Sequence, residues 1–399
     1  MIAEQALHRQ PELVIEYIDP LEGFTGWLVI HRLTHRLCAG GLRVQPGLTR
    51  ETVENLAATM TLKMRVAGIR ADGAKSGIDY DPTSPRKQAA LSRFIRAIKP
   101  YILSRYSMGP DMNTTMPELD DICRHHGIAS AKIAVAKAQE LDLDDFQKRI
   151  SLLAQPLAHA TLGRLRSGAG LAAAALATLN HLDIPPRQAR VTIQGFGGLA
   201  AGAAFFLNQA GVRLIGLADR EKTLVDTTGK GFDLKPLLAR STNGLLPTDT
   251  PENARAEIST RPEKIFDLPC DLCIPAAVEG AIDVPRAKAL TTRAVVCGAN
   301  LAVTDHAGDI LQQRGILVIP DLVAGCGGSL SMEGLFGPGT APGVQQVLDH
   351  ITDRMQVIVH DILSRSEREN ISPRQAALHR CEQVRLEPES PPYRSYSDF

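Results

Sequence analysis

The stretch Val191-Thr192-Ile193-Gln194-Gly195-Phe196-Gly197-Gly198-Leu199-Ala200 passes from a short apolar segment through a glycine turn into the start of a helix. Its pattern is G-x-G-x-x-A: Gly195 permits a tight turn, Gly197 lets a pyrophosphate approach the backbone, and Ala200 allows close helix–strand packing. The first N–H groups of the helix would face the phosphates. The stretch predicts a dinucleotide site, although a glycine turn used only for packing is the alternative. The contacts expected in the turn come from Gly195, Phe196, Gly197, Gly198 and Leu199.

An acidic residue follows the next apolar segment. Residues 212–218 read as a strand, and Asp219 comes directly after it. A carboxylate in that place can accept both ribose hydroxyls of NAD and repel a 2′-phosphate. Arg220 is next in the chain and could accommodate NADP instead. We therefore predict NAD as the cofactor, with NADP as the alternative.

Strand and helix patterns divide the chain into two domains of an α/β protein. In residues 157–335, short apolar strands (191–194, 212–218, 271–275, 294–297 and 316–319) alternate with helices, which is typical of a doubly wound parallel sheet. Residues 1–156 mix strands within 13–46 with helices at 51–68, 87–104 and 116–125. We predict that 1–156 is a substrate-binding and catalytic domain that also forms oligomer contacts, and that 157–335 is a Rossmann-type NAD-binding domain.

The C-terminal part continues with a helix and a polar tail. Apolar residues at helical spacing between 344 and 362 predict a long amphipathic helix. We expect the segment 336–380 to be a helical return that packs on the first domain. Residues 381–399 are rich in Pro, Ser, Glu and Arg, so we expect a mobile tail or an oligomer contact.

Composition excludes several classes of partner. The 399 residues carry 44 basic and 44 acidic side chains, which favours neither nucleic acid nor a membrane surface. No apolar run approaches the roughly 20 residues of a membrane span, and the first residues are unlike a signal peptide. Seven scattered cysteines suggest reduced thiols and a cytoplasmic protein. Cys270 and Cys273 have zinc-like spacing without further ligands, so we interpret them as buried strand cysteines and predict no metal site.

Two lysines suggest the chemistry. Lys75 lies among the small residues of Ala71-Asp72-Gly73-Ala74-Lys75-Ser76-Gly77, which we interpret as a turn close to a ligand. Lys63 belongs to the predicted helix 51–68, about 20° around its axis from Leu56, at the border of the apolar face. The alternative interpretation is that both lysines are exposed surface residues without a role in catalysis. A cationic pair facing a cleft in a dinucleotide-binding protein instead suggests redox chemistry on an amino acid.

The order of short blocks resembles the amino-acid dehydrogenases for glutamate, leucine, phenylalanine and valine over roughly residues 25–335. The blocks are Gly40-Gly41-Leu42-Arg43, Met60-Thr61-Leu62-Lys63, Gly73-Ala74-Lys75-Ser76-Gly77, Gly109-Pro110-Asp111-Met112-Asn113-Thr114, Ser167-Gly168-Ala169-Gly170, Gln194-Gly195-Phe196-Gly197, Ile274-Pro275-Ala276-Ala277, Gly298-Ala299-Asn300, Arg314-Gly315-Ile316, Pro320-Asp321 and Gly327-Gly328.

The resemblance implies roles for individual residues. Lys63 would hold the substrate α-carboxylate, Lys75 would be the catalytic lysine, and Asp111 would shuttle a proton to and from the substrate nitrogen. Ser167 would contact the nicotinamide carboxamide, and Asn300 would lie in the loop lining the nicotinamide. Further cofactor positions implied by the matching blocks are Ala276 and Ala277. A lysine acts as a base only if its pKa falls toward neutrality, which burial and a second ammonium both favour.

The resemblance also bears on the substrate. In the glutamate enzymes a lysine precedes the Gly40-Gly41 block and binds the side-chain carboxylate, but here Ala39 takes its place. A serine used for the same carboxylate is replaced by Met332. A buried second carboxylate without partners is costly, so we expect an apolar side chain, aliphatic or aromatic.

The expected activity is reversible NAD-dependent oxidative deamination of such an L-amino acid to its 2-oxo acid and ammonia, by a homo-oligomer. Two departures from the family pattern are Gly325, where an asparagine is usual, and the Ala- and Lys-rich segment 127–160, which reads as helical. They keep two alternatives open: a catalytically weak relative that binds NAD(H) and an amino acid as a sensor or partner, and an oxidoreductase acting on a different substrate class.

Overall fold

The computed structural model describes residues 10–241, 244–247, 256–383 and 387–394. It is an α/β structure, as predicted, whose chain divides into two compact units. Unit 1 consists of Met1–Lys148, Phe336–Gly339 and Leu378–Phe399, and unit 2 of Arg149–Leu335 and Thr340–Ala377. Within the described ranges, no helix has the length and apolar character needed to cross a membrane.

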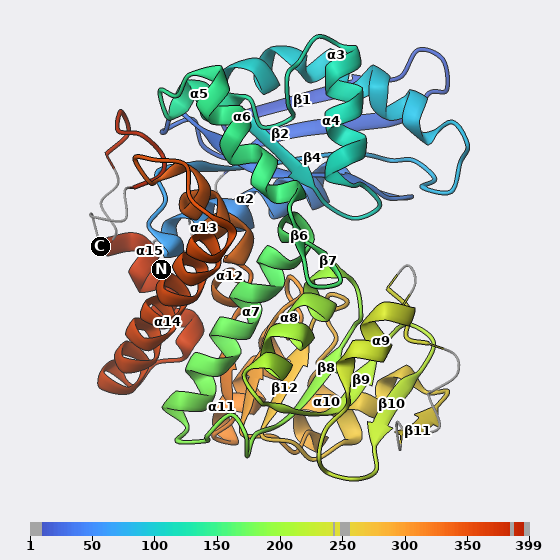
Figure 1. Cartoon of the computed structure of the whole chain (residues 1–399), viewed down its shortest axis with the longest axis vertical. Helices are drawn as coiled ribbons and strands as arrows, with labels where there is room; N and C mark the ends of the chain where they lie inside the picture. Colours follow the sequence, from blue (N-terminus) through green and yellow to red (C-terminus); the bar gives the residue numbers. More distant parts are fainter. Residues whose placement is uncertain (1–9, 242–243, 248–255, 384–386, 395–399) are drawn as a thin grey trace. The chain divides into compact units, whose positions relative to one another are not determined.

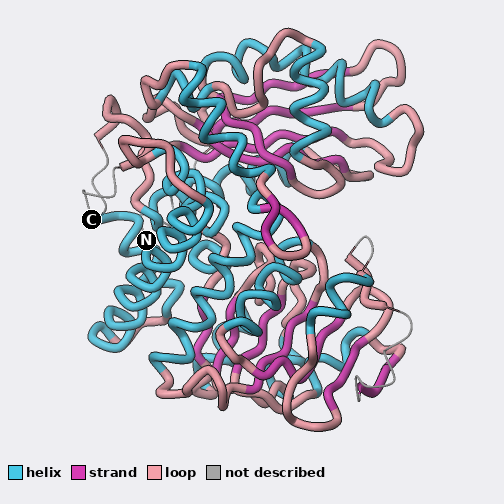
Figure 2. Tube along the Cα trace, viewed as in Figure 1, coloured by secondary structure: helices cyan, strands magenta, loops and turns pink. Residues whose placement is uncertain are grey.

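Unit 1 is built on a five-stranded sheet with the order β1-β2-β4-β3-β5 (Figures 1 and 2). Strands β1 (Leu13–Ile18), β2 (Thr25–Ile30) and β3 (Cys38–Val44) confirm the strands predicted within 13–46. Strand β2 is antiparallel to both of its neighbours, whereas β4 (Asp72–Ile78), β3 and β5 (Tyr106–Pro110) run parallel. The turn predicted around Lys75 is wrong: this residue lies inside β4, whose small residues fit because neighbouring chains pack closely there.

Helices cover both faces of this sheet. Helix α2 (Arg50–Ala67) begins at Thr49, whose side chain accepts a hydrogen bond from the Thr52 N–H, and ends at Gly68 with φ 72°. Its apolar face packs with Trp27, Val29 and Leu48. Helices α3 (Lys87–Ser104) and α4 (Met116–His125) pack on the opposite face and enclose the main core of the unit. All three helices confirm the sequence prediction.

The segment 127–160, predicted to be helical, is helical over about half of its length. It contains α5 (Ala134–Ala138), α6 (Leu143–Ser151) and the 3₁₀ turn η1 (Leu152–Ala154). The periodicity did not predict the two-stranded ribbon that follows, formed by β6 (Pro156–Leu157) and β7 (Ala160–Thr161).

Unit 2 carries a seven-stranded sheet with the order β11-β10-β9-β8-β12-β13-β14. The parallel part is β9 (Arg213–Ala218), β8 (Arg190–Gln194), β12 (Leu272–Pro275), β13 (Ala294–Val296) and β14 (Leu317–Ile319), each within one residue of its predicted bounds. Strands β10 (Thr223–Asp226) and β11 (Ala256–Ser259) extend it in antiparallel fashion. This is the Rossmann-type sheet that the alternation predicted.

Helices α7 (Leu162–His181) and α8 (Gly198–Gln209) of unit 2 pack against each other (Figure 1). A Cβ on Gly168 would lie 2.5 Å from the Ala203 nitrogen, so the two backbones nearly touch. Further helical segments of the unit are α9 (Leu234–Arg240), η3 (Pro262–Asp267), α10 (Val284–Ala289), α11 (Asp305–Gln313), α12 (Asp321–Ala324) and α13 (Gly327–Phe336), whose last residue belongs to unit 1.

The C-terminal helices differ from the prediction in one respect. The long helix α14 (Val344–Glu369) was expected on the first domain, but its apolar face packs against α7 in unit 2. The return to unit 1 is made by the end of α15 (Pro373–Gln383), where Arg380 Nε donates to the Val66 carbonyl at 2.9 Å. The apolar pattern of a helix predicts that this face is buried, but it does not predict which part of the protein packs against it.

The prediction of a mobile tail is wrong for residues 387–394. Tyr393 is only 4% exposed, and its ring stacks with Phe336. Its backbone N–H and carbonyl both bond to the Gln139 side chain, at 3.1 and 2.9 Å. This segment therefore packs on unit 1, while 384–386 and 395–399 lie outside the described residues.

Candidate active site

The register of β3, β4 and β5 brings three predicted residues onto one face of the unit 1 sheet. Leu42 pairs with Ser76, and Gly41 pairs with Gly109. The neighbouring residues Leu42, Ala74 and Met108 point into the core shared with α3 and α4. Because side chains alternate along a strand, the opposite face, on the side of α2, presents Gly41 from β3, Lys75 from β4 and Gly109 from β5, and Asp111 follows directly after β5.

Small residues allow α2 and β3 to approach β4 closely. A Cβ on Gly40 would overlap the Ala74 carbonyl oxygen, and one on Gly73 would overlap the backbone of α2 at Ala57 and Thr61. The same helix contributes Lys63, which is only 8% exposed. Its placement explains why a lysine lies at the border of an apolar face: α2 lies directly over the strand that carries Lys75.

Lys75, Asp111 and Arg43 form a cluster of charges, which we call the Asp111 cluster. Lys75 Nζ lies 2.6 Å from Asp111 Oδ2, and Arg43 Nε lies 3.0 Å from the same oxygen. Lys75 is buried, whereas the Asp111 side chain keeps 21% of its surface exposed. The Asp111 carboxylate is therefore partly accessible to solvent, whereas the Lys75 ammonium beside it is buried.

Burial and neighbouring charges shift the pKa values of this cluster. Burial lowers the pKa of Lys75 most, and Arg43 and Lys63 lower it further, against the opposing effect of Asp111. Burial alone would raise the pKa of Asp111, but Lys75 and Arg43 together outweigh it and hold this pKa below its usual range. Lys75 is thus a lysine that can lose its proton more easily than an exposed one, as a general base must.

The turn after β5 fixes the position of Asp111. The Asp111 N–H donates to Thr114 Oγ1 at 3.0 Å, and that hydroxyl donates to the Leu42 carbonyl at 2.8 Å. Asn113 adopts φ 62° and its side-chain amide donates to the Val44 carbonyl at 2.9 Å. The turn is therefore tied to β3, the strand that also carries Arg43.

Sequence reasoning missed two cations on this face. Arg43 belongs to a quoted block, and its position two residues after Gly41, on the same strand face, was the available signal. Lys132 had none, because it comes from the unusual segment 127–160. It is only 4% exposed, and a Cβ on Gly109 would lie 3.5 Å from its Nζ.

The glycine turn of unit 2 has the geometry that a dinucleotide requires. Gly195 adopts φ 99°, with Ala276 and Ala277 packed against it, so a side chain would be strained there. Gly197 precedes the first turn of α8, and a Cβ at this position would meet nothing within 4 Å. The open side of Gly197 and the free amides of the α8 start fit a pyrophosphate.

Asp219 lies where predicted, at the end of β9, but its carboxylate already has backbone partners. Oδ1 accepts from the N–H groups of Glu221 and Lys222 at 2.7 and 2.9 Å, and Oδ2 accepts from Leu246 at 2.7 Å. Asp219 is only 5% exposed, whereas the Arg220 side chain is 74% exposed. Asp219 therefore has a structural task besides any contact with a ribose.

Other predicted cofactor residues gather at the carboxyl ends of the parallel strands. The Ala276 N–H donates to the Gln194 carbonyl, and Gly298 packs against Ala276, which brings the loop of Asn300 to the same edge. A Cβ on Gly328 would lie 3.3 Å from Ser167 Oγ.

Two positions that depart from the family pattern lie close together in the chain. Gly325 ends α12 with φ −81°, a conformation that needs no glycine. Met332 is buried within α13, also in unit 2.

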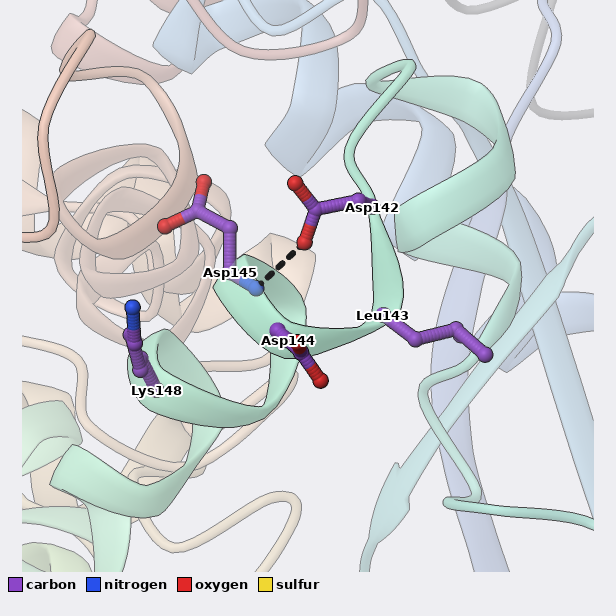
Figure 3. Close-up of a pocket in the computed structure, with 5 residues that line it drawn as sticks. All are labelled: Asp142, Leu143, Asp144, Asp145 and Lys148. Carbon is purple, nitrogen blue, oxygen red and sulfur yellow. Dashed lines mark hydrogen bonds between the residues drawn. The ribbon is translucent and has the colours of Figure 1, made fainter.

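A hollow at the start of α6 is separate from these residues (Figure 3). Asp142 Oδ1 accepts from the Asp145 N–H at 2.7 Å, as an N-cap residue does. Acidic side chains at a helix start are stabilised by the helix dipole, so this hollow has a structural explanation. Its lining residues are Asp142, Leu143, Asp144, Asp145 and Lys148.

A Rossmann-type unit with an open glycine turn, in a chain that also buries a lysine beside an aspartate, is typical of dinucleotide-dependent oxidoreductases. Residues 164–386 match the family described as Glutamate/Leucine/Phenylalanine/Valine dehydrogenase, and residues 11–126 match the Glu/Leu/Phe/Val dehydrogenase dimerisation domain. The chain belongs to this family of amino-acid dehydrogenases, as the ordered blocks predicted.

Curated relatives cover most of the chain. The glutamate dehydrogenase of Thermotoga maritima is 29% identical over 375 residues, which are 90% of this chain and 83% of that protein. The NAD-specific glutamate dehydrogenase of Staphylococcus aureus is 30% identical over 311 residues, 76% and 70% of the two chains. The NADP-specific glutamate dehydrogenase of Saccharolobus shibatae is 29% identical over 336 residues, 80% and 74%.

Solved structures share the fold. The hetero-hexameric glutamate dehydrogenase of Thermus thermophilus, in its Leu-bound form, aligns with a TM-score of 0.73 at 24% identity, covering 96% of this chain and 93% of that one. The L-tryptophan dehydrogenase of Nostoc punctiforme aligns with a TM-score of 0.61 at 17% identity, covering 96% and 97%.

Proposed function

We propose that this protein catalyses the reversible oxidative deamination of an apolar L-amino acid, with NAD as the preferred cofactor. The Asp111 cluster, together with Lys63 on the same face of unit 1, carries the proposal. Water and the oxidised dinucleotide are consumed, and a 2-oxo acid, ammonia, the reduced dinucleotide and a proton are formed. The oxidised dinucleotide, when bound, would supply the acceptor for the Cα hydrogen and its electron pair, so that a C=N bond remains on the substrate.

Each charged residue has a role in this reaction. Lys63 binds the α-carboxylate of the substrate through its ammonium. Lys75, in its neutral form, takes a proton from the water that attacks the carbon of the C=N bond. Asp111 takes a proton from the substrate ammonium before the Cα hydrogen leaves, and it later returns this proton to the nitrogen, so that the C–N bond breaks and ammonia leaves. A lysine with a lowered pKa and an ionised aspartate 2.6 Å away suit these tasks, because each must first accept a proton.

The residues of unit 2 support the cofactor part of the proposal. The helix start after Gly197 would hold the pyrophosphate, with Gly195, Phe196, Gly198 and Leu199 around it. Ser167, Ala276, Ala277 and Asn300 would surround the nicotinamide. For the ribose, Asp219 favours NAD and the exposed Arg220 favours NADP; relatives of both specificities exist.

The apolar substrate class rests on Ala39 and Met332, which replace two polar anchors. Gly41 lies two residues after Ala39 on the same face of the strand and, next to Gly109, forms a floor without side chains. A flat or branched apolar side chain fits such a floor. The leucine and tryptophan named for the two similar structures are compatible with this class.

Lys132 favours a second candidate, a dehydrogenase of an acidic amino acid. Its ammonium lies over Gly109, beside the floor, where it could pair with a side-chain carboxylate. The Lys132→Met variant separates the two candidates. If the substrate is acidic, its KM should rise at least tenfold in this variant, whereas an apolar substrate should keep or improve its KM.

The first test is NAD(P)H formation at 340 nm with the twenty L-amino acids, each with NAD and with NADP. Strong activity with leucine, valine, phenylalanine or tryptophan that disappears in Lys75→Ala supports the proposal. Activity confined to glutamate or aspartate replaces the apolar class with the acidic one. No activity with any pair would contradict the proposed reaction.

We also propose a homo-oligomer. Residues 11–126 match a domain that is named for dimerisation, and the similar Thermus enzyme is hetero-hexameric. Molar mass by light scattering tests this, and a monomer at micromolar concentration would contradict it.

A further inference from the structure

One oxygen of Asp111 receives both cations of the cluster. Lys75 Nζ and Arg43 Nε approach Oδ2 at 2.6 and 3.0 Å. In the described part of the chain, no hydrogen bond reaches Oδ1. The carboxylate is therefore anchored at one oxygen and available at the other.

The proposed reaction creates a difficulty for this anchor. Lys75 can accept a proton only after losing its own, and a neutral amine no longer balances the charge of Asp111. A carboxylate left without a cation in a mostly buried place is strongly destabilised. It would rotate toward water or stay protonated, and in either case it could not take the proton of the substrate ammonium. A second cation that never loses its charge would prevent both.

Arg43 is that cation. A guanidinium does not deprotonate in a protein, so its charge persists when Lys75 is neutral. Its direction is fixed at both ends: Nε bonds to Asp111, and Nη1 donates to Gln45 Oε1 at 3.2 Å. Arg43 and the Asp111 turn are also held by the same strand, since Thr114 donates to the Leu42 carbonyl.

We propose that Arg43 is a positioning residue that keeps Oδ2 of Asp111 anchored in either charge state of Lys75, so that Oδ1 stays presented to the substrate nitrogen. The role of Oδ1 at the substrate nitrogen rests on the proposed function. The effect of Arg43 on the charges of Asp111 and Lys75 can be tested in the protein without substrate. Nothing in the family match assigns this arginine a role.

The charges that face Lys75 determine what removal of Arg43 should do. They are Asp111 directly after β5, Arg43 on β3 and Lys63 on α2. Asp111 also acts on the buried Tyr106, and Lys132 lies over Gly109 on the same face. Arg43 lowers the pKa of Lys75, so its loss should raise that pKa and leave Asp111 with Lys75 as its one ion partner among the residues that the structure describes.

The test compares Arg43→Gln and Arg43→Lys with a control, Arg50→Gln, which alters an exposed arginine of the same unit paired with Glu54. The intact protein, without substrate, is treated briefly with acetic anhydride at a series of pH values, and acetylation of Lys75 is measured by peptide mass spectrometry. In Arg43→Gln the midpoint should move to higher pH. In Arg43→Lys and Arg50→Gln it should stay near that of the wild type.

A second readout uses turnover. In Arg43→Gln, kcat should fall about 10- to 100-fold, and the acid limb of the kcat/KM profile should move to higher pH, because Lys75 must be neutral to act. Arg43→Lys should restore part of kcat. KM should change less than kcat, since Arg43 does not bind the substrate carboxylate.

An unchanged acetylation midpoint in Arg43→Gln, with near-UV circular dichroism like that of the wild type, overturns the proposal. So does an equal shift in Arg50→Gln. If Arg43→Gln does not fold, Arg43→Met replaces it, and the same two criteria apply. Because acetylation requires no turnover, a wild type inactive toward every amino acid would sink the proposed function alone, and the midpoints would still decide the role of Arg43.

Discussion

Unit 1 and unit 2 form their functional regions in different ways. In unit 1, charged side chains from separate segments of the chain come together. Lys75 Nζ and Arg43 Nε lie 2.6 and 3.0 Å from the same oxygen of Asp111. In unit 2 the backbone performs the task, through the positive φ of Gly195 and the helix start after Gly197. Substitutions in the first region should therefore alter protonation while the fold persists, and substitutions in the second should alter backbone shape or cofactor affinity.

The largest effect is expected for Lys75→Ala. Removing the general base should reduce kcat/KM by about 10²- to 10⁴-fold and leave the dissociation constant of the dinucleotide unchanged. Steady-state kinetics and cofactor fluorescence measure the two quantities. Lys137→Ala, at an exposed lysine of the same unit, is the control. A Lys75→Ala enzyme with a tenth of wild-type kcat/KM would remove Lys75 from the mechanism.

Asp111→Asn should reduce kcat by about 10²-fold and also move the pH profile. Asp111 raises the pKa of Lys75, so its neutralisation lowers that pKa. Since activity requires neutral Lys75, the acid limb should move to lower pH, opposite to the shift expected for Arg43→Gln. Initial rates between pH 6 and 11 measure both limbs. Shifts of the same sign in the two variants would contradict the electrostatic account of unit 1.

A pair of glycine substitutions tests the backbone account of unit 2. Gly197→Ala meets no atom within 4 Å, so the melting temperature should be unchanged, while the dissociation constant of NAD should rise about tenfold, or about 1.4 kcal/mol. Gly195→Ala must adopt φ 99° and should cost roughly 1–2 kcal/mol of unfolding free energy. Thermal melts and cofactor titration separate the two effects. Equal melting temperatures for both variants would show that the turn is not strained.

The smallest effect concerns the choice of cofactor. Arg220 is largely exposed, so its attraction for a 2′-phosphate is screened and worth about 0.2–1 kcal/mol. Arg220→Ala should thus reduce kcat/KM for NADP by up to about fivefold and leave the value for NAD unchanged. An unchanged NADP value would show that Arg220 does not reach the cofactor.

The contrast between the units also explains what could be predicted from the sequence. The five parallel strands of unit 2 are predicted within one residue because the glycine motif and the alternation of apolar segments are local signals, whereas β10 and β11 are not predicted. The Asp111 cluster depends on the order β4-β3-β5, which no local pattern encodes. The resemblance supplied Lys75 and Asp111 as candidates, but the 2.6 Å contact and the participation of Arg43 required the pairing of distant strands.

The errors have the same origin. Small residues around Lys75 suggested a turn, whereas they allow close packing within a sheet. The apolar face of α14 did not reveal that α7 would cover it. The ribose contact predicted for Asp219 depends only on its charge and its place after a strand. The structure shows that three backbone N–H groups also donate hydrogen bonds to its carboxylate.

The central claim is that unit 1 uses a neutralised Lys75 for the deamination of an amino acid whose Cα hydrogen leaves with its electrons. The most direct measurement follows deuterium from the Cα of the best substrate in the amino-acid panel, with NMR of the recovered cofactor and mass spectrometry of the oxo acid. The account predicts one deuterium in the reduced dinucleotide for each oxo acid formed, and neither product with Lys75→Ala. Deuterium released to water, or full product formation by Lys75→Ala, would contradict it.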